Sequence, residues 1–476
     1  MTELSISLPG LLVALFLPWL VGAACARPLL PGGVPGRHYL VVGFGYFLGC
    51  FLAALALRLA DALGAPLQFF ALAIALGLFG LLVILASRPA VVGQRAPGMG
   101  QAAISPTGKA LVGGLLALLA WRYLTLLGIV VEQPLFGWDA MMNWAPKAIV
   151  WFHRGELTEF VAPGVWLREA TAAGPYTLGN PAASTYPEMV PLVFLWHMLG
   201  AGTWDHPLLQ LPWLLAAVNL GLVFYGLMRL AGAGTVAAAF ASYCLLSLPY
   251  LNIHTAIAGY ADLWLAAIFG FGAIGLHEWE QRGRVRMALA VLVAAVMCMQ
   301  LKNPGIVLGL LLLLGMLRIR LALRYRTELL IAAAVVMVAA LAVTFGLVLD
   351  LPGLGHLSFE PGQFQVGMFG PEQLSFHAQV APAVLRSLFD LANWHLLWYL
   401  AVALLLRIAL LERDWRRPGT LAVIMLALAS LYFVVFFFSK YYYHALSYIT
   451  FNRAVLYVVP VLVFWLFTRS ARAEGK

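Results

Sequence analysis

Long apolar stretches recur from one end of the chain to the other. They are about 17–25 residues long, which is the length that an α-helix needs to cross a bilayer. Short segments rich in Gly, Pro and charged residues separate them. This pattern is typical of membrane helices rather than of the weaker alternation of a β-barrel. It predicts an all-α fold, a polytopic transmembrane helical bundle.

Thirteen membrane spans are expected from these stretches. They cover Ser7–Ala24, Tyr39–Leu57, Leu67–Ala86, Ala110–Val130, Leu208–Leu230, Val236–Leu251, Thr255–Leu276, Ala288–Leu301, Gly305–Met316, Leu329–Leu349, Trp394–Leu411, Leu421–Phe438 and Ala454–Phe467. Lys and Arg gather after the odd-numbered spans, beginning with Arg27 and Arg37 after the first. Because these charges resist translocation, we expect the N-terminus outside and the C-terminus inside.

The composition agrees with a membrane protein. Hydrophobic residues make up 63% of the 476 residues and charged residues 10%, against about 45–50% and 25% in a typical soluble domain. The net charge of +9 is largely explained by the predicted inner-face clusters, which favour anionic membrane lipids. We therefore expect membrane lipids as partners and no nucleic acid.

Two predicted outer segments are long, residues 131–207 and 350–393. The first holds a Trp-rich, helix-like run and an apolar run too short to span, so we expect interfacial helices there. Residues 88–109 have the composition of a flexible inner linker. The sequence contains no P-loop, no dinucleotide fingerprint and no HExxH motif. Nucleotide-driven chemistry is disfavoured, and we expect no cofactor, although a divalent metal stays an alternative.

Polar and ionisable residues collect near the predicted outer face. Charge close to a membrane is costly, so residues that inner-face anchoring does not explain are candidates for function. They are Asp139, Asn143, Lys147, Glu188, His254, Asp262, Lys302, Lys440, His444 and Arg453.

Asp139 is the candidate general base, because a carboxylate partly shielded from water by neighbouring indole rings gains basicity. The alternative is that it caps the following helix. Asn143 and Lys147 follow at four-residue steps and share a helical face with it if the helix is continuous. Pro146 could instead begin a second helix.

The other candidates also have structural alternatives. Asp262 and Glu188 either cap helices or face the same site. Lys302 lies in a turn and is either a phosphate partner or an interfacial anchor. An interfacial aromatic belt explains the tyrosines beside Lys440 and His444. It does not explain Arg453.

Five features of the sequence, taken in their order along the chain and all on the predicted outer side, resemble those of the GT-C superfamily of integral-membrane glycosyltransferases. This superfamily includes protein O-mannosyltransferases and bacterial lipid-glycan sugar transferases. They are Trp138-Asp139, the Tyr-Pro-x-x-x-Pro-Leu run from Tyr186 to Leu192, Asp262, the turn from Lys302 to Gly305, and Arg453. The resemblance covers about Leu111 to Phe467. It implies a catalytic module over residues 111–476, and leaves the helices of residues 1–110 without an assigned role.

The resemblance implies transfer of a sugar from a polyprenyl-phosphate carrier to a lipid, glycan or protein acceptor, with inversion, on the non-cytoplasmic side. A bacterial inner membrane with the site facing the periplasm fits this activity. Asp139 would be the general base, and Lys302 and Arg453 would bind the carrier phosphate. The remaining candidates would orient substrate: Asn143, Lys147, Glu188, His254, Asp262, Lys440 and His444.

Two other classes stay open. A lipid or polyanion transporter or flippase also needs many helices and intramembrane charge. A lipid-linked glycan polymerase or ligase also combines many spans with a large outer loop.

Overall fold

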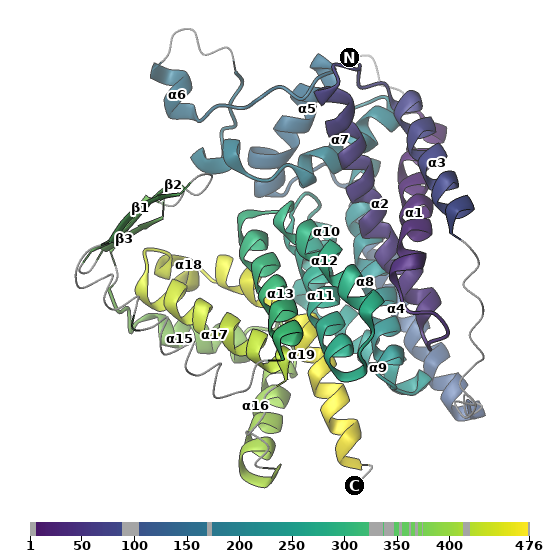
Figure 1. The fold of residues 1–476 in the computed structure, drawn as a ribbon, viewed down its shortest axis with the longest axis vertical. Helices are drawn as coiled ribbons and strands as arrows, with labels where there is room; N and C mark the ends of the chain where they lie inside the picture. Colours follow the sequence, from purple (N-terminus) through teal and green to yellow (C-terminus); the bar gives the residue numbers. More distant parts are fainter. Residues whose placement is uncertain are drawn as a thin grey trace. The chain divides into compact units, whose positions relative to one another are not determined.

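The chain folds into two compact units (Figure 1). The computed structural model describes residues 6–87, 104–168, 174–322, 337, 347–351, 355–360, 363–366, 370–373, 375–412 and 419–474. The first unit is Met1–Leu313 with Leu456–Lys476, and the second is Leu314–Val455.

Helices make up nearly all of the first unit. Outside the first predicted outer loop, its helices are α1 (Leu8–Leu29), α2 (Arg37–Ala62), α3 (Phe69–Ala86), α4 (Pro106–Glu132), α8 (Leu211–Leu230), α9 (Thr235–Leu246), α10 (Pro249–Ala256), α11 (Asp262–Arg282), α12 (Val285–Met299), most of α13 (Asn303–Leu321) and most of α19 (Thr450–Glu474). The first predicted outer loop contains the short helices η1 (Ala140–Trp144), α5 (Ala145–Arg154), α6 (Pro163–Arg168), η2 (Pro181–Thr185), α7 (Met189–Ala201) and η3 (Pro207–Gln210).

Small residues bring the first two helices together. A side chain at Gly22 would overlap the backbone of Gly45, and one at Gly49 would overlap the carbonyl group of Pro18. Without a hydrophobic driving force between helices in lipid, such close backbone contact is a main source of packing energy. Helix α2 in turn donates a hydrogen bond of 2.8 Å from the Tyr46 hydroxyl to the Pro212 carbonyl of α8. Helices α1 and α2 are thus integral to the first unit.

Eight helices of the described part of the chain are long and apolar enough to cross a membrane, so the chain is a multi-pass membrane protein. They correspond to the predicted spans 1 to 5, 9, 12 and 13. Predicted span 7 coincides with α11, which is not among the eight. Predicted spans 8 and 11 coincide with the shorter apolar helices α12 and α16 (Leu397–Arg407). The total of thirteen spans stays a prediction.

The predicted sixth span is not one straight helix. Helix α9 ends at Leu246 and α10 begins at Pro249, with a bend of 64° between them. Proline lacks the N–H that would continue a helical ladder, so the helix restarts there in a new direction. Thr255, predicted to open the seventh span, instead belongs to the end of α10. The seventh predicted helix begins at Asp262.

Basic loops gather at one end of the first unit. Arg282, at the end of α11, donates to the Ala231 carbonyl after α8 over 2.9 Å, and a side chain at Gly36, in the loop after α1, would overlap Arg229 of α8. The loops that follow α1, α8 and α11 therefore meet at the same end, as the predicted alternation of sides requires. Which membrane face this end occupies stays a prediction.

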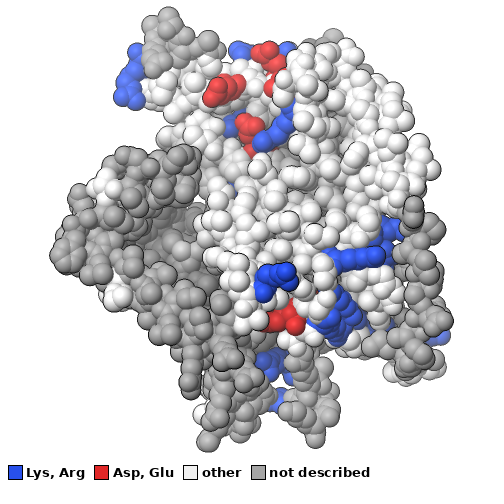
Figure 2. Space-filling model, viewed as in Figure 1, with Lys and Arg blue, Asp and Glu red and all other residues white. Residues whose placement is uncertain are grey.

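The opposite end of α2 contacts the first outer loop. Asp61 accepts a hydrogen bond of 2.8 Å from the Leu157 amide, and Arg58 forms an ion pair of 3.4 Å with Glu188. Among the described residues on the face shown in Figure 2, charged side chains gather toward the upper and the lower part, and uncharged residues dominate the surface between these parts. This arrangement is the one expected for a helical unit that spans a bilayer.

The second unit contains a small sheet besides helices. Strands β1 (Leu347–Leu351), β2 (Gly355–Glu360), β3 (Gln363–Val366) and β4 (Gly370–Gln373) pair in chain order as an antiparallel meander, with Leu347 opposite Phe359. Its helices are α15 (Val380–Leu385), η5 (Arg386–Asp390), α16, η6 (Ile408–Glu412), α17 (Thr420–Phe438) and α18 (Tyr442–Leu446).

The sheet corrects part of the sequence prediction. Residues 347–349, predicted as the end of the tenth span, are in β1, and the second outer loop holds strands that the apolar pattern did not indicate. The rest of that predicted span lies outside the described residues apart from Met337, which is helical. Most of the predicted linker, residues 88–103, also lies outside them, while Lys109 belongs to α4.

Candidate active site

A break between helices places Asp262 at the candidate site. After α10 the chain turns through Gly259, whose φ of +87° suits glycine, and α11 starts three residues later. A side chain at Gly259 would overlap Ala140 of η1. The close approach that glycine allows brings the first turn of α11 beside the start of η1.

Asp139 immediately precedes η1, and it does not cap this helix. Its side chain accepts no capping hydrogen bond from the following turn, so the capping alternative is wrong. Its backbone N–H donates to the Tyr260 hydroxyl over 3.4 Å. Its carboxylate Oδ2 lies 3.8 Å from the ammonium of Lys302, and its side chain is 13% exposed.

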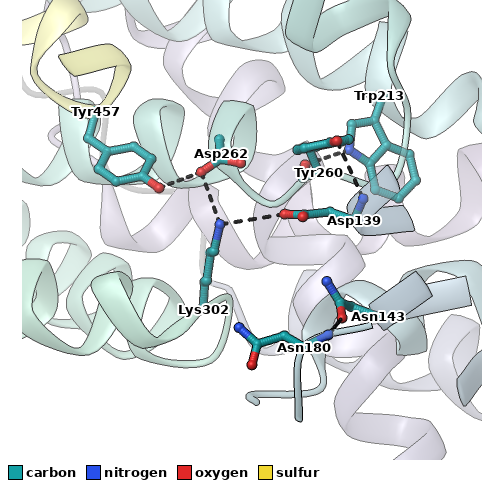
Figure 3. Close-up of polar contacts among 8 residues, drawn as sticks. All are labelled: Asp139, Asn143, Asn180, Trp213, Tyr260, Asp262, Lys302 and Tyr457. Carbon is teal, nitrogen blue, oxygen red and sulfur yellow. Dashed lines mark hydrogen bonds and ion pairs between the residues drawn. The ribbon is translucent and has the colours of Figure 1, made fainter. Parts of the chain in front are cut away.

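Lys302 joins Asp139 to a second carboxylate (Figure 3). Its Nζ lies 3.4 Å from Oδ1 of Asp262, a side chain with no exposed area. The Tyr457 hydroxyl of α19 donates to this same Oδ1. One ammonium therefore sits between two carboxylates, and the more deeply buried carboxylate has an additional hydrogen-bond donor.

The centre formed by Asp139, Lys302 and Asp262 has a clear electrostatic logic. A buried carboxylate needs a cation and hydrogen-bond donors to stay ionised, and Asp262 has Lys302 and Tyr457. Asp139 shares the same cation over a longer distance and keeps some solvent access. This arrangement supports Asp139 as the member that can meet an incoming hydroxyl group, with Asp262 fixed behind it.

Asn143 and Lys147 fasten the outer loop. The helix that follows Asp139 is continuous, because the π-helical turn η1 runs directly into α5 with Pro146 in its first turn. The backbone N–H of Asn180 donates to the side-chain oxygen Oδ1 of Asn143 over 2.8 Å, as Figure 3 shows. The Lys147 ammonium donates to the Ser184 carbonyl over 3.2 Å. Both side chains thus hold the segment before α7.

Lys147 is also almost fully buried. Burial lowers the pKa of its ammonium, and the charge of Glu188 acts in the opposite direction. The ammonium lies 5.5 Å from the centre of the Phe160 ring. These contacts show that Lys147 stabilises the outer loop. Its contact with a substrate stays a prediction.

Glu188 occupies the cap position of α7 without a capping hydrogen bond. Its carboxylate pairs with Arg58, which is not among the residues predicted for the site. Both side chains are more than one third exposed, so this pair contributes little to stability by itself. A signal was present in the sequence, because Arg58 follows the predicted second span on the side where arginine is scarce.

His254 belongs to an aromatic layer behind Asp139. It is 2% exposed, and its ring lies 4.9 Å from that of Tyr250 and 5.5 Å from that of Tyr260. The Tyr260 carbonyl accepts a hydrogen bond of 2.8 Å from the Trp213 indole, which Figure 3 includes. Trp213, Tyr260 and His254 restrict water on one side of the site.

Three predicted residues lie in the second unit. Arg453 is 9% exposed on α19. Lys440 is exposed, and its ammonium lies 5.8 Å from the Tyr441 ring centre. Burial, and secondarily the charge of Arg453, lower the pKa of His444. These residues form an aromatic and basic region, and their predicted roles toward the donor stay predictions.

In the described ranges, no group of three or more His, Cys, Asp or Glu side chains is placed to hold a metal ion. The chain has no significant match among known protein families, curated proteins or solved structures. The class of protein is therefore defined by the fold and by the geometry of the site. It is a multi-pass helical membrane protein with a carboxylate–ammonium–carboxylate centre at the end of the first unit opposite its arginine-rich loops.

Proposed function

We propose that the protein is a membrane glycosyltransferase of the GT-C type. It transfers a sugar from a polyprenyl-phosphate carrier to a lipid, glycan or protein acceptor on the non-cytoplasmic side, with inversion at the anomeric carbon. One observation carries the proposal. Asp139 and Lys302, which lie far apart in the sequence, are 3.8 Å apart beside the buried Asp262.

In this proposal Asp139 is the general base. It removes the proton of the acceptor hydroxyl while that oxygen attacks the anomeric carbon and the bond to the carrier phosphate breaks. General-base help of this kind contributes about 10²–10⁴-fold. The position of Asp139 at the more open side of the centre supports this role.

Lys302 and Arg453 stabilise the negative charge that develops on the leaving phosphate. A polyprenyl phosphate is a weak base, so its departure does not require a strong general acid. Such a pair of fixed cations in a site of low dielectric contributes on the order of a few kcal/mol to stabilisation of the transition state. The partial burial of Lys302 supports such a site.

Sugar transfer by the purified protein is the direct test. The native protein is incubated in detergent with a panel of radiolabelled polyprenyl-phosphate sugars and a membrane lipid extract as acceptor. We expect label in a product of inverted anomeric configuration, measured by NMR. Asp139→Asn should reduce turnover by at least about 100-fold, because it removes the base.

Asp205→Asn is the matched control. Asp205 is an exposed carboxylate of the same outer loop, outside the candidate site, and its loss should leave turnover unchanged. Normal turnover in Asp139→Asn would refute the base assignment. Saturable donor binding without turnover by the native protein would instead favour a transporter, which movement of the donor across liposomes would then reveal.

A further inference from the structure

Asp262 and Tyr457 are the more deeply buried members of the set of polar contacts around Lys302 in Figure 3. Asp262 is 0% exposed and Tyr457 is 4% exposed, whereas the side chains of Lys302 and Asp139 are 15% and 13% exposed. The Asp262 carboxylate, which is fully covered, cannot meet an acceptor directly. Its chemical effect has to pass through a neighbour, and the neighbour here is Lys302.

The contacts are directional. The Tyr457 hydroxyl and the Lys302 ammonium approach the same oxygen, Oδ1 of Asp262. A hydroxyl that donates to a carboxylate fixes its rotamer and spreads its charge. The distance from Lys302 to Asp262 is 3.4 Å, shorter than its 3.8 Å to Asp139. Lys302 is therefore anchored at Asp262 and reaches toward Asp139.

We infer that Tyr457 and Asp262 are positioning residues that hold the Lys302 ammonium beside the reacting carboxylate. This inference rests on the proposed function. Without the Tyr457 hydroxyl, Asp262 would lose one of the two donors that meet at its Oδ1, and its carboxylate would hold Lys302 less firmly in place beside Asp139. Without the Asp262 charge, Lys302 would lose its fixed anchor. Both changes would impair the chemical step more than the binding of the donor.

The reactivity of Lys302 tests its placement without any need for sugar transfer. Native protein, Asp262→Asn and Tyr457→Phe are treated briefly with acetic anhydride, and mass spectrometry measures acetylation of Lys302 relative to Lys109. Lys109 is an exposed lysine of α4 and serves as the internal reference. The Lys302 ammonium is held by its contacts with Asp139 and Asp262, which shield it from the reagent, so it should be acetylated slowly.

We expect the relative acetylation rate to rise by about five- to tenfold in Asp262→Asn, where one of two flanking charges is lost from a partly exposed pair. A smaller change, about twofold, is expected in Tyr457→Phe, because a neutral donor is removed. Tyr46→Phe, which removes another buried tyrosine hydroxyl of the first unit, should leave the rate unchanged. Equal rates in all four proteins would overturn the inference.

The kinetic consequence separates positioning from mere stability. For Tyr457→Phe we expect kcat to fall by about tenfold or more with little change in the KM for the donor, and Tyr46→Phe to match the native protein. A rise in the KM for the donor without a fall in kcat would contradict a positioning role. Equal falls in kcat in Tyr457→Phe and Tyr46→Phe would contradict it as well. If the native protein transfers no sugar but Lys302 is still acetylated faster in Asp262→Asn and Tyr457→Phe than in the native protein, the proposed function is refuted and the placement of Lys302 stands.

Discussion

Replacement of Lys302 by Met should destabilise the protein more than its partly exposed position suggests. Removal of one partner from a fully buried ion pair costs about 3–5 kcal/mol, because the other charge is left buried. Here Asp262 is fully buried, but it keeps the Tyr457 hydroxyl as a donor, and Lys302 is 15% exposed. We therefore expect the free energy of unfolding to fall by about 2–3 kcal/mol.

Asp262→Asn should lower the free energy of unfolding by less than Lys302→Met does. Lys302 keeps Asp139 as a partner in this variant, and its remaining exposure lets water solvate the ammonium. We expect a loss of about 1–2 kcal/mol. The double variant removes both the fully buried Asp262 carboxylate and the Lys302 ammonium, and only the partly exposed Asp139 loses its contact with Lys302. It should be more stable than the sum of the two single losses predicts, by a coupling free energy of about 1–2 kcal/mol.

The assay is SDS-driven unfolding in mixed micelles at pH 7, followed by tryptophan fluorescence, for the native protein, both single variants and the double variant. Lys109→Met is the matched control and should match the native protein, because Lys109 is exposed on α4. The coupling should change little between 0.15 and 1 M salt, since a partly buried pair is screened weakly. Additive losses in the cycle would refute the ion-paired centre.

Two further predictions concern other parts of the molecule. Burial, and secondarily the charge of Arg453, lower the pKa of His444 below its ordinary 6.5, so its neutral form is favoured in the folded protein. The stability linked to it should be complete above pH 6.5 and fall at more acidic pH, and His444→Gln should flatten that limb in unfolding measured from pH 8 to 5. Gly49→Val should destabilise the contact of α1 with α2 by about 3 kcal/mol or more in the same unfolding assay, because the new side chain overlaps the backbone at Pro18. Gly113→Val, where no heavy atom lies within 4 Å of the new Cβ, should have a small effect.

Apolar periodicity predicted most long helices because lipid-facing segments must satisfy their backbone hydrogen bonds internally. It failed where that constraint weakens. The bend between α9 and α10 depends on Pro249 within an apolar run, which hydropathy does not distinguish from a straight span. The strands of the second unit lie in a predicted outer loop, where backbone groups can pair between neighbouring segments.

The candidate site was predictable in part. The sidedness of the loops placed Asp139, Asp262 and Lys302 at one end, and the structure brings these three together. Tyr457 was missed, because a tyrosine among valines in the last span looks like any other lipid-embedded residue. Arg58 was missed because it lies at the margin of a span. Distances between side chains depend on helix rotation and packing, and hydropathy carries no information on either.

The shared ammonium links the two predicted roles of the centre. Lys302 carries one positive charge and already faces two carboxylates, so the group formed by Asp139, Lys302 and Asp262 has a net charge of −1 when all three are ionised. A phosphate that approached this group alone would meet net repulsion. Donor binding in the proposed reaction therefore requires at least one further cation, and Arg453 is the candidate that the sequence supplies. It follows that, in the proposed reaction, Lys302 cannot supply the affinity for the carrier phosphate alone, because it shares its charge with two carboxylates while it faces the charge that develops as the phosphate leaves.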